Sequence, residues 1–306
     1  MEIKKNRIEL KLNDQTSLFG RAWTVEKSVA NVIIMEGMEE HATRYDDFAS
    51  YLCSKGIDVY CIDTYGQGEN VNPDMSNLGV WPESGFRKMV QATDQLVAKL
   101  RVSWHPIYIF AHSMGSFMAQ DYIQRYTEHV SKVVLCGSGA KNPATEIGFA
   151  LAKLTTTKKN RNDKSHLLNK LMFGNFNRHI QNPKTPFDWL SYNEENVVDY
   201  IADPLDGFGP TKGFCYEFLK GMRRLYKHKF LKKIKKDLKL FIISGADDPV
   251  SNFGHDVGRL KNMYKKLGLE HVHTKIYKDA RHEILNESEP IKKEVYKDIA
   301  DFFLGE

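Results

Sequence analysis

The sequence has no long apolar run. None of its stretches approaches the roughly 18 apolar residues that a membrane-spanning helix needs, and the first ten residues, MEIKKNRIEL, carry charges and no apolar core of a signal peptide. There is also little excess of charge of one sign, because 44 basic and 39 acidic residues leave a net charge of only +5. No motif of a nucleic-acid-binding protein is present. We therefore expect a soluble protein, most simply a cytoplasmic one, without a nucleic-acid partner.

Cysteine is scarce as well. The four cysteines, at positions 53, 61, 136 and 215, are widely spaced and form no pair with metal-ligand spacing. We therefore expect buried free thiols in a reducing compartment. The segment GQGEN at 66–70 is too short and wrongly placed to be a phosphate-binding loop. No metal and no cofactor is expected.

One dense basic segment, KHKFLKKIKKDLKL at 227–240, has two interpretations. Its lysines could attract the segment to an anionic lipid surface. Alternatively, the lysines are solvated while Phe230, Leu231, Ile234 and Leu238, which recur at helical spacing, face a core. The second interpretation is favoured, because helices that lie on membranes carry a larger and purer apolar face.

Short segments rich in β-branched and aromatic residues alternate with segments of helical period. This alternation predicts an α/β fold, in which an eight-stranded, mostly parallel sheet has helices on both faces. A short turn at 13–16 joins the first two strands, so they should form an antiparallel lead-in. Strands are expected at 7–12, 18–25, 30–35, 57–63, 107–111, 131–137, 238–245 and 272–278, and helices at about 43–55, 83–101, 114–127, 254–267 and 290–303.

The alternation stops between about 140 and 235, where the sequence indicates helices and loops without a strand. We predict that residues 140–235 form an inserted helical cap, or lid, called the cap segment below, on a core formed by 1–139 and 236–306. Its apolar residues could line a cavity or simply hold the cap on the core, and for each one singly the second role is favoured. They include Phe149, Leu151, Leu154, Phe173 and Trp189.

The segment FAHSMGSF at 110–117 lies where the fifth strand should turn into a helix. A sharp turn of this kind exposes the side chain of its central residue, Ser113, and crowds the residues two before and two after it. Both positions are small here, Ala111 and Gly115. We expect His112 to point the other way along the turn and to have a packing role. The pattern makes Ser113 a candidate nucleophile.

A serine hydroxyl needs a base, and the base needs an orienting acid. In this architecture the acid and then the histidine follow the serine, each after a strand. The strand ending at Gly245 is followed by ADDPV, which offers Asp248, with Asp247 as its close competitor. The last strand is followed by DARHEILNE, which offers His282. The predicted catalytic residues are Ser113, His282 and Asp248.

The developing negative charge on the substrate also needs backbone N–H donors. One candidate is the residue after the nucleophile, Met114, and the other is Met38, in the loop that follows the strand at 30–35. Gly37 would allow that loop an unusual backbone conformation. We predict that the amides of Met38 and Met114 form the oxyanion hole.

With these residues in place, the sequence resembles the monoacylglycerol lipase and lysophospholipase branch of the α/β-hydrolase superfamily, in its bacterial form. That branch has the motifs His-Gly-x-Gly-Glu-His-x-x-Arg-Tyr, Gly-His-Ser-Met-Gly and Arg/Tyr-His-Glu-x-Leu-Asn-Glu. The corresponding segments here are EGMEEHATRY at 36–45, AHSMG at 111–115 and RHEILNE at 281–287, and the cap segment adds DWLS, YIADPLDGF and Thr211. The resemblance covers nearly the whole chain. It implies an α/β-hydrolase fold and hydrolysis of single-chain lipid esters through an acyl-enzyme.

Two departures from that branch concern the oxyanion loop: Glu36 replaces a histidine and Glu39 replaces a glycine. A carboxylate about 5 Å from an oxyanion would cost roughly 3 kcal/mol at an effective dielectric constant of about 20. One oxyanion-hole donor contributes a similar ~2.7–4 kcal/mol. We therefore expect Glu36 to be turned out of the hole. The segment DTYGQGEN at 63–70 also departs from the branch, although Asp63, Gly66 and Gly68 keep its turn.

The leading hypothesis is a serine hydrolase that cleaves carboxylic esters, with monoacylglycerols or lysophospholipids as substrates and with transient contact to a membrane surface. An esterase, amidase or peptidase acting on a small non-lipid substrate is an alternative, because a fold does not fix a substrate. A second alternative, motivated by Glu36 and Glu39, is a binding protein with impaired catalysis. The sequence fixes neither the head group of the substrate nor the oligomeric state.

Overall fold

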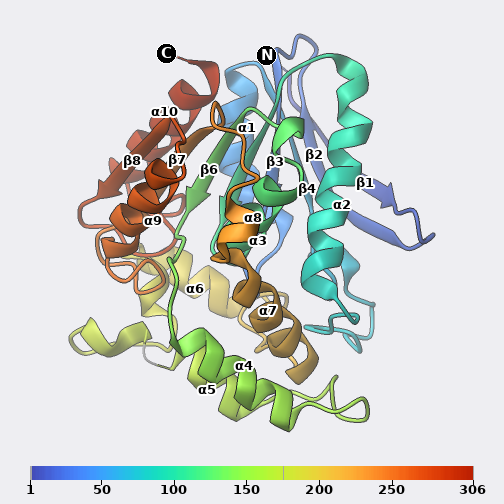
Figure 1. The fold of residues 1–306 in the computed structure, drawn as a ribbon, viewed down its shortest axis with the longest axis vertical. Coiled ribbons are helices and arrows are strands. Elements are labelled where there is room, and N and C mark those ends of the chain that lie inside the picture. The colour runs from blue at the N-terminus through green and yellow to red at the C-terminus, as the bar shows by residue number, and fades with distance from the viewer. Residues whose placement is uncertain (1, 175, 306) are drawn as a thin grey trace.

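The computed structural model describes residues 2–174 and 176–305, and its centre is a single eight-stranded sheet (Figure 1). The strands follow the order β1-β2-β4-β3-β5-β6-β7-β8. β2 pairs antiparallel with β1 and with β4, and all the other neighbours are parallel. The predicted fold class and the antiparallel lead-in are therefore confirmed. The strands are β1 (Lys4–Lys11), β2 (Ser17–Thr24), β3 (Ala30–Met35), β4 (Ile57–Ile62), β5 (Ile107–His112), β6 (Lys132–Cys136), β7 (Lys239–Gly245) and β8 (Val272–Tyr277).

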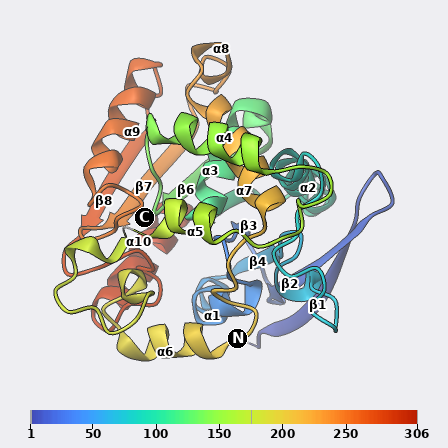
Figure 2. The same ribbon diagram turned by 90° about the horizontal axis from the view of Figure 1, so that it is seen from below.

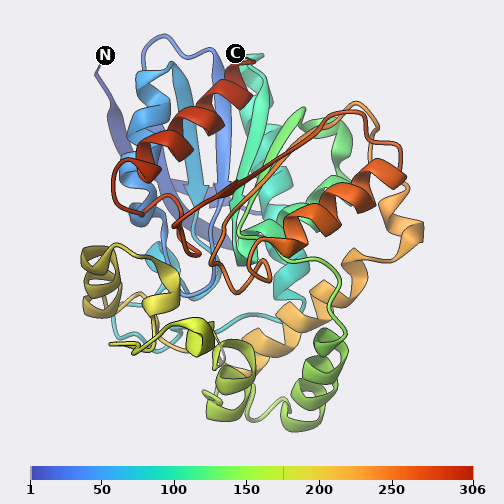
Figure 3. The same cartoon turned by 90° about the vertical axis from the view of Figure 1, so that its left-hand side faces the viewer.

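Helices cover both faces of the sheet. One face packs against α1 (Asp46–Ser54) and α10 (Ile291–Leu304), and Figure 3 shows α10 in dark red crossing in front of the strands. The other face packs against α2 (Gly85–Leu100), α3 (Met114–Arg125) and α9 (His255–Lys266). These five helices lie within three residues of their expected positions.

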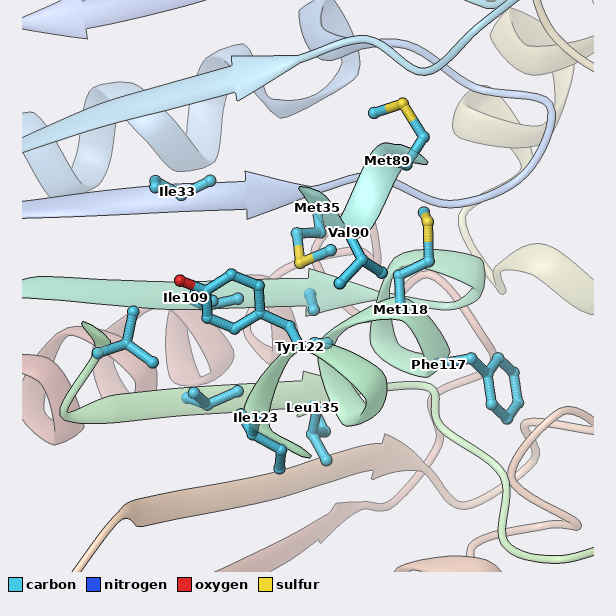
Figure 4. Packing of buried hydrophobic residues seen from close by; sticks show 14 of the residues in the cluster. Ile33, Met35, Met89, Val90, Ile109, Phe117, Met118, Tyr122, Ile123 and Leu135 are labelled. Atoms are coloured by element: carbon cyan, nitrogen blue, oxygen red, sulfur yellow. The ribbon is translucent and has the colours of Figure 1, made fainter. Parts of the chain in front are cut away.

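The central strands are apolar on both sides because both faces are covered. In β3, Ile33 and Met35 belong to the core on the α2 and α3 side, and Val32 and Ile34 belong to the core on the α1 and α10 side. Figure 4 shows the first of these cores, where Leu135 of β6 also lies. This two-sided burial fixes the strand register, and therefore the positions of the loops that leave the carboxyl ends of the strands.

The chain between β6 and β7 is helical. Apart from a single bridge between Lys164 and Thr211, its described residues form no β-structure. Figures 1 and 2 show α4, α5, α6 and α7 gathered at one end of the sheet. The helices are α4 (Ala144–Thr155), α5 (His166–Phe173), α6 (Glu194–Ala202), α7 (Lys212–Leu225) and α8 (His228–Leu231).

The basic segment at 227–240 contains only one helical turn, α8, and not a continuous helix. Leu231, Ile234 and Leu238 are nevertheless buried in the core, while the lysines between them are exposed. Phe230 is half-buried, with the guanidinium of Arg224 lying 3.7 Å from its ring centre. The segment therefore anchors itself to the core through its apolar residues, as the favoured interpretation expects.

The four cysteines are all buried and unpaired, as the sequence indicates. Burial raises the pKa of the Cys61 and Cys136 thiols well above their usual value, so these thiols stay protonated at neutral pH. Within residues 2–174 and 176–305, no helix is both long enough and apolar enough to cross a membrane.

Packing around the central strands predicts that two leucine substitutions change the free energy of unfolding by different amounts. Leu135 is 0% exposed in β6 and Leu154 is 82% exposed on α4. Leu135→Ala should lower the free energy of unfolding by about 2–5 kcal/mol, because it leaves a cavity in the core. Leu154→Ala should change it by less than about 0.5 kcal/mol. Urea unfolding followed by circular dichroism measures both, and equal losses in the two variants would contradict this packing.

Candidate active site

Ser113 lies at the turn between β5 and α3, in a backbone conformation that non-glycine residues rarely adopt, with φ 50° and ψ −117°. Its N–H donates to the carbonyl of Cys136 on the neighbouring strand at 3.0 Å, which holds the turn against the sheet. A Cβ atom at Gly115 would meet the carbonyl oxygen of Met35 at 2.0 Å, so glycine is required there by space. The strained turn presents the Ser113 side chain at the carboxyl end of the sheet.

His282 and Asp248 form a buried pair. The Nδ1 atom of His282 lies 2.8 Å from Oδ1 of Asp248, and both side chains are almost fully buried. The N–H of Val250 and the hydroxyl of Ser244 also donate to this carboxylate, at 2.8 and 2.9 Å. Burial alone would raise the pKa of Asp248, but His282 and these donors outweigh it and hold the pKa below its usual value. Asp248 therefore stays ionised at neutral pH and orients the ring.

Asp247, the competing candidate for the acid, has different surroundings. Its side chain is exposed and accepts a hydrogen bond from the Tyr192 hydroxyl at 2.9 Å. The geometry therefore pairs His282 with Asp248 and leaves Asp247 at the surface.

Ser113 and His282 both line a cavity of about 320 Å³ between the carboxyl ends of the strands and the cap segment. The Nε2 atom of His282 is buried and has no hydrogen-bond partner among the described residues, so the serine hydroxyl is not bonded to it. Catalytic hydrogen bonds are often open in a ligand-free protein and close in the substrate complex. The Trp189 ring lies 5.0 Å from the His282 ring and belongs to the same wall.

The loop that follows β3, residues 36–41, called the β3 loop below, forms another part of this wall. Met38 lines the cavity between two neighbours whose N–H groups are already bound: Gly37 donates to the Glu40 carboxylate and Glu39 donates to the Gln67 side chain. Met114 is the first residue of α3, where the first N–H groups have no acceptor within the helix. Of the two predicted oxyanion donors, Met38 thus lies within a fixed loop and Met114 at the start of a helix.

Gly37 is needed for a different reason from the one we expected. It is not among the residues with positive φ, whereas Glu39 is, with φ 62°. A Cβ atom at Gly37 would meet Oε1 of Glu40 at 2.3 Å and Nδ1 of His112 at 3.2 Å. The glycine therefore makes room for the Glu40 carboxylate.

Gln67 organises the β3 loop, a role that the sequence did not reveal. Its side-chain amide donates to Oε1 of Glu36 at 2.9 Å and to the carbonyls of Gly37 and Glu40 at 3.1 and 2.9 Å, and its oxygen accepts from the N–H of Glu39 at 3.0 Å. The residue is completely buried. One side chain therefore fixes the peptide groups on both sides of Met38.

Glu36 is turned away from the cavity, as we expected. Its Oε1 accepts from the N–H of Thr64 at 2.8 Å and from Gln67, and its side chain is buried behind the β3 loop. Burial and the nearby Asp63 carboxylate raise the pKa of Glu36 well above its usual value. The raised pKa favours the neutral form of Glu36, and its carboxyl group is not among those that line the cavity.

The expectation that His112 points away from the site is wrong. Its ring lines the cavity, with its centre 4.7 Å from that of His282, because Nδ1 pairs with Oε1 of Glu40 at 3.0 Å. Burial alone would lower the pKa of His112, but Glu40 outweighs it and raises the pKa above its usual value. Burial likewise opposes ionisation of Glu40, yet His112, Arg44 and the Tyr45 hydroxyl lower its pKa to about 2. The two side chains form a buried ion pair beneath the cavity.

Arg44 connects the β3 side of the site to the cap segment and to the His282 loop. Its guanidinium bonds Oδ2 of Asp206 at 2.9 Å and Oε2 of Glu283 at 2.6 Å, and it lies 4.7 Å from the ring centre of Tyr200. Only about 10% of the Arg44 side chain is exposed. A single buried cation therefore joins three segments that line the cavity.

Two clusters bring three candidate metal-ligating atoms close together: Glu36 with Cys61 and Asp63, and His41 with Asp203 and Asp206. Hydrogen bonds within the protein already engage several of these side chains. Asp63 accepts from the N–H groups of Ala42 and Glu69, each at 2.7 Å, and Nε2 of His41 lies 3.2 Å from Asp203. Neither cluster indicates a metal centre.

The burial of Arg44 gives a prediction about stability. Arg44→Met leaves the Asp206 and Glu283 carboxylates without their cation in a buried site, and the free energy of unfolding should fall by about 3–5 kcal/mol. Arg7, whose side chain is 54% exposed where it pairs with Glu69, provides the control. Arg7→Met should cost about 1 kcal/mol or less. Equal urea midpoints for the two variants would contradict the connecting role of Arg44.

Comparisons with known proteins agree with this fold. Residues 26–289 match the model of the family described as serine aminopeptidase, S33. A probable lysophospholipase L2 from Haemophilus influenzae is 24% identical, over 89% of this chain and 82% of its own. A monoacylglycerol lipase from Mycolicibacterium smegmatis is 25% identical, over 92% of this chain and 91% of its own.

A solved structure is similar over nearly the whole chain. The crystal structure of a highly thermostable carboxyl esterase from Bacillus coagulans, in complex with glycerol, superposes with a TM-score of 0.89, at 26% identity and over 99% of each chain. The chain therefore belongs to the serine aminopeptidase S33 family, in the monoacylglycerol lipase-like branch of the α/β-hydrolases.

Proposed function

We propose that the protein is a serine hydrolase that cleaves carboxylic esters, and that its substrates are lipids with a single acyl chain, such as monoacylglycerols or lysophospholipids. The observation that carries the proposal is the buried pair of His282 and Asp248, since His282 lies in the wall of the same cavity as Ser113. Ser113 lies on a strained strand-to-helix turn of the kind used by nucleophilic serines.

In the first half of the reaction, the Ser113 hydroxyl oxygen attacks the ester carbonyl while His282 takes the hydroxyl proton on Nε2. The negative charge that develops on the carbonyl oxygen accepts hydrogen bonds from the amides of Met38 and Met114. His282 then gives its proton to the departing alcohol oxygen as the bond between that oxygen and the acyl carbon breaks. The products of this half are a free alcohol and an acyl ester on Ser113.

In the second half, a water molecule attacks the acyl carbon and His282 takes a proton from that water. The proton passes to the Ser113 oxygen as the acyl bond breaks, which releases the fatty acid and restores the serine. Asp248 keeps its negative charge throughout and stabilises the imidazolium that forms twice in each cycle. Its lowered pKa is the property that this role requires.

The cavity has room and chemistry for one acyl chain. Part of its wall is apolar and comes from the cap segment, through Phe173, Phe187, Trp189 and Leu190. We propose that the 140–235 insertion acts as a cap over the site in this way. The names of the relatives, a lysophospholipase and a monoacylglycerol lipase, support lipid esters as the substrate class.

The description of the family as a serine aminopeptidase keeps a second candidate function, the cleavage of small amides or peptides. A series of p-nitrophenyl esters of increasing acyl length separates the two. A lipid hydrolase prefers medium or long chains over acetate, whereas an amidase or peptidase cleaves aminoacyl p-nitroanilides and shows no gain with chain length. A binding protein without turnover would cleave neither class.

The catalytic assignment predicts which serine reacts with a covalent probe and which aspartate is needed for turnover. The protein should react with a fluorophosphonate probe, and Ser113→Ala should abolish the labelling. Asp248→Asn should lower kcat by roughly 10³-fold or more, since His282 would lose its orienting acceptor. The neighbouring Asp247→Asn should change it by less than about twofold, because that carboxylate is exposed. Labelling that survives Ser113→Ala, or an equal loss for both asparagine variants, would refute the assignment.

We further propose that the substrate reaches the site through transient contact between the cap segment and a lipid surface. Four large apolar side chains are exposed on α4 and α5, where membrane lipids could cover them; they are Ile147, Leu154, Leu167 and Leu171.

This contact can be tested with lipid vesicles. Replacing Leu154 and Leu171 together by serine should reduce co-sedimentation with vesicles of phosphatidylcholine and phosphatidylglycerol, because less apolar surface enters the lipid. Turnover of a water-soluble p-nitrophenyl ester should be kept. Unchanged co-sedimentation of the double variant would exclude this surface.

A further inference from the structure

We propose that Glu39 forms a polar subsite in the cavity wall, which selects esters whose alcohol part carries a hydroxyl group and no negative charge. This inference rests on the proposed function, because it concerns the alcohol that Ser113 would release. It also distinguishes between monoacylglycerols and anionic lysophospholipids as substrates.

The position of Glu39 is fixed from both sides. Its N–H donates to the Gln67 side chain at 3.0 Å, and its carbonyl accepts from the N–H of Gly207 in the cap segment at 3.2 Å. Its Oε2 accepts a further hydrogen bond from the N–H of Gly209 at 3.1 Å. The residue is 5% exposed and lines the cavity. The carboxyl group is therefore a rigid part of the wall, one residue from the proposed oxyanion donor Met38.

One oxygen of this carboxyl group has no partner within the described protein. Oε1 of Glu39 is buried and has no hydrogen-bond partner among the described residues. A buried acceptor without a partner is costly, and a donor supplied by a ligand would remove that cost. Oε1 thus has the properties of an unfilled acceptor for a substrate group.

The other two carboxylates of the wall are already neutralised. Glu40 pairs with His112 at 3.0 Å and with the Tyr45 hydroxyl, and Glu283 pairs with Arg44 at 2.6 Å. Glu39 differs from both because its hydrogen-bond donor is a backbone N–H. Glu39 is therefore the carboxyl group of this wall that has no cationic side chain within ion-pair distance among the described residues.

Two further polar side chains line the cavity close to Glu39. Asn169 of α5 approaches Gly209, since its Nδ2 lies 3.7 Å from the place where a Gly209 Cβ would be. Tyr200 of α6 lines the cavity as well, and after burial it is the Glu39 carboxylate that contributes most to raising the pKa of its hydroxyl. Three elements thus bring acceptors and donors to one region, as recognition of a hydroxyl-bearing group requires.

The acyl chain and the alcohol part of an ester substrate fit this region differently. A hydrocarbon chain against Glu39 would leave Oε1 unsatisfied, so the chain belongs on the aromatic part of the wall. The alcohol part belongs at Glu39. A neutral hydroxyl there donates to Oε1, whereas a phosphodiester carries a negative charge, has no donor of its own and is repelled by an ionised Glu39.

The charge of Glu39 changes near neutral pH. Burial raises its pKa to about 7, against the opposing effects of the Gly209 N–H and of Lys164, whose exposed ammonium group bonds the carbonyls of Phe208 and Gly209. The other titratable groups that sense Glu39 are Tyr200 of α6 and Cys215 of α7, and both stay neutral because burial raises the pKa of each. Above pH 7 Glu39 is mostly ionised, so rejection of an anionic head group should strengthen as the pH rises.

The cavity also has a cationic side chain, which would favour the opposite selection. Lys170 lines the cavity from the exposed side of α5. If its charge dominated, the protein would favour an anionic head group instead. A direct comparison of substrates therefore decides the question.

The experiment compares three decanoyl esters below their aggregation limits: 1-decanoylglycerol, 1-decanoyl-lysophosphatidylglycerol and methyl decanoate. The lysophospholipid keeps a single negative charge across the pH range. For the unaltered protein, kcat/KM should be highest for the glycerol ester. The ratio of glycerol ester to lysophospholipid should rise as the pH increases from 6 to 8.5, while any pH dependence of the catalytic steps that both substrates share cancels in the ratio.

Glu39→Gln keeps the size of the side chain and removes its charge. It should lower kcat/KM for 1-decanoylglycerol by about tenfold relative to methyl decanoate, the loss expected for one hydrogen bond to a charged group. It should also flatten the pH dependence of the ratio. Glu39→Gly removes the carboxyl group and suits the positive φ of 62° at this position, so it provides a second variant that is expected to fold. Glu146→Gln, on the exposed surface of α4, is the matched control and should change nothing.

The outcomes separate this inference from the proposed function. If the unaltered protein cleaves methyl decanoate but the Glu39 variants lower kcat/KM for all three esters equally, the subsite is refuted and the hydrolase remains. A preference of the unaltered protein for the lysophospholipid would also refute the subsite. If no ester is cleaved and no fluorophosphonate labelling occurs, the proposed function itself has failed.

Discussion

The hydrogen bond between His282 and Asp248 is the interaction on which the rest of the site depends. It joins the loop after β8 to the loop after β7, and both side chains are almost fully buried. Burial penalises a charged aspartate, yet the ring, the Val250 N–H and the Ser244 hydroxyl keep its pKa low. Because the aspartate stays charged, it holds the imidazole in one fixed orientation. The Nε2 atom then has no hydrogen-bond partner among the described residues and is left for a ligand. The chemical roles proposed for Ser113, Met38 and Met114 all require that orientation.

A second set of buried polar contacts holds the cap segment to this centre. Arg44 bonds Asp206 of the cap segment and Glu283 beside the catalytic histidine, and Glu39 reaches Gly207 and Gly209 through its main chain and its side chain. The cavity is therefore closed by directional contacts as well as by apolar ones. Such contacts fix the position of the cap segment relative to the core around the cavity.

The strands and the candidate triad could be predicted from the sequence because their signals are local. Apolar runs marked the strands to within a few residues, and small residues around Ser113 marked the turn. The orientation of His112 and the role of Gln67 could not be predicted, because each depends on a partner distant in sequence. His112 turns toward Glu40, and Gln67 bonds four groups of the β3 loop. Glu36 and the segment DTYGQGEN look like separate departures in the sequence, but in the fold the side chains of Glu36 and Gln67 bond each other.

The most direct test of the central claim is a crystal structure of the protein after inactivation by a decyl phosphonate ester, which mimics the tetrahedral intermediate. The account predicts a covalent bond from phosphorus to the Ser113 oxygen and a phosphoryl oxygen within about 3.1 Å of the Met38 and Met114 nitrogen atoms. It also predicts that Nε2 of His282 donates to another oxygen of the adduct. An adduct on a different residue, or a phosphoryl oxygen that neither amide contacts, would contradict it.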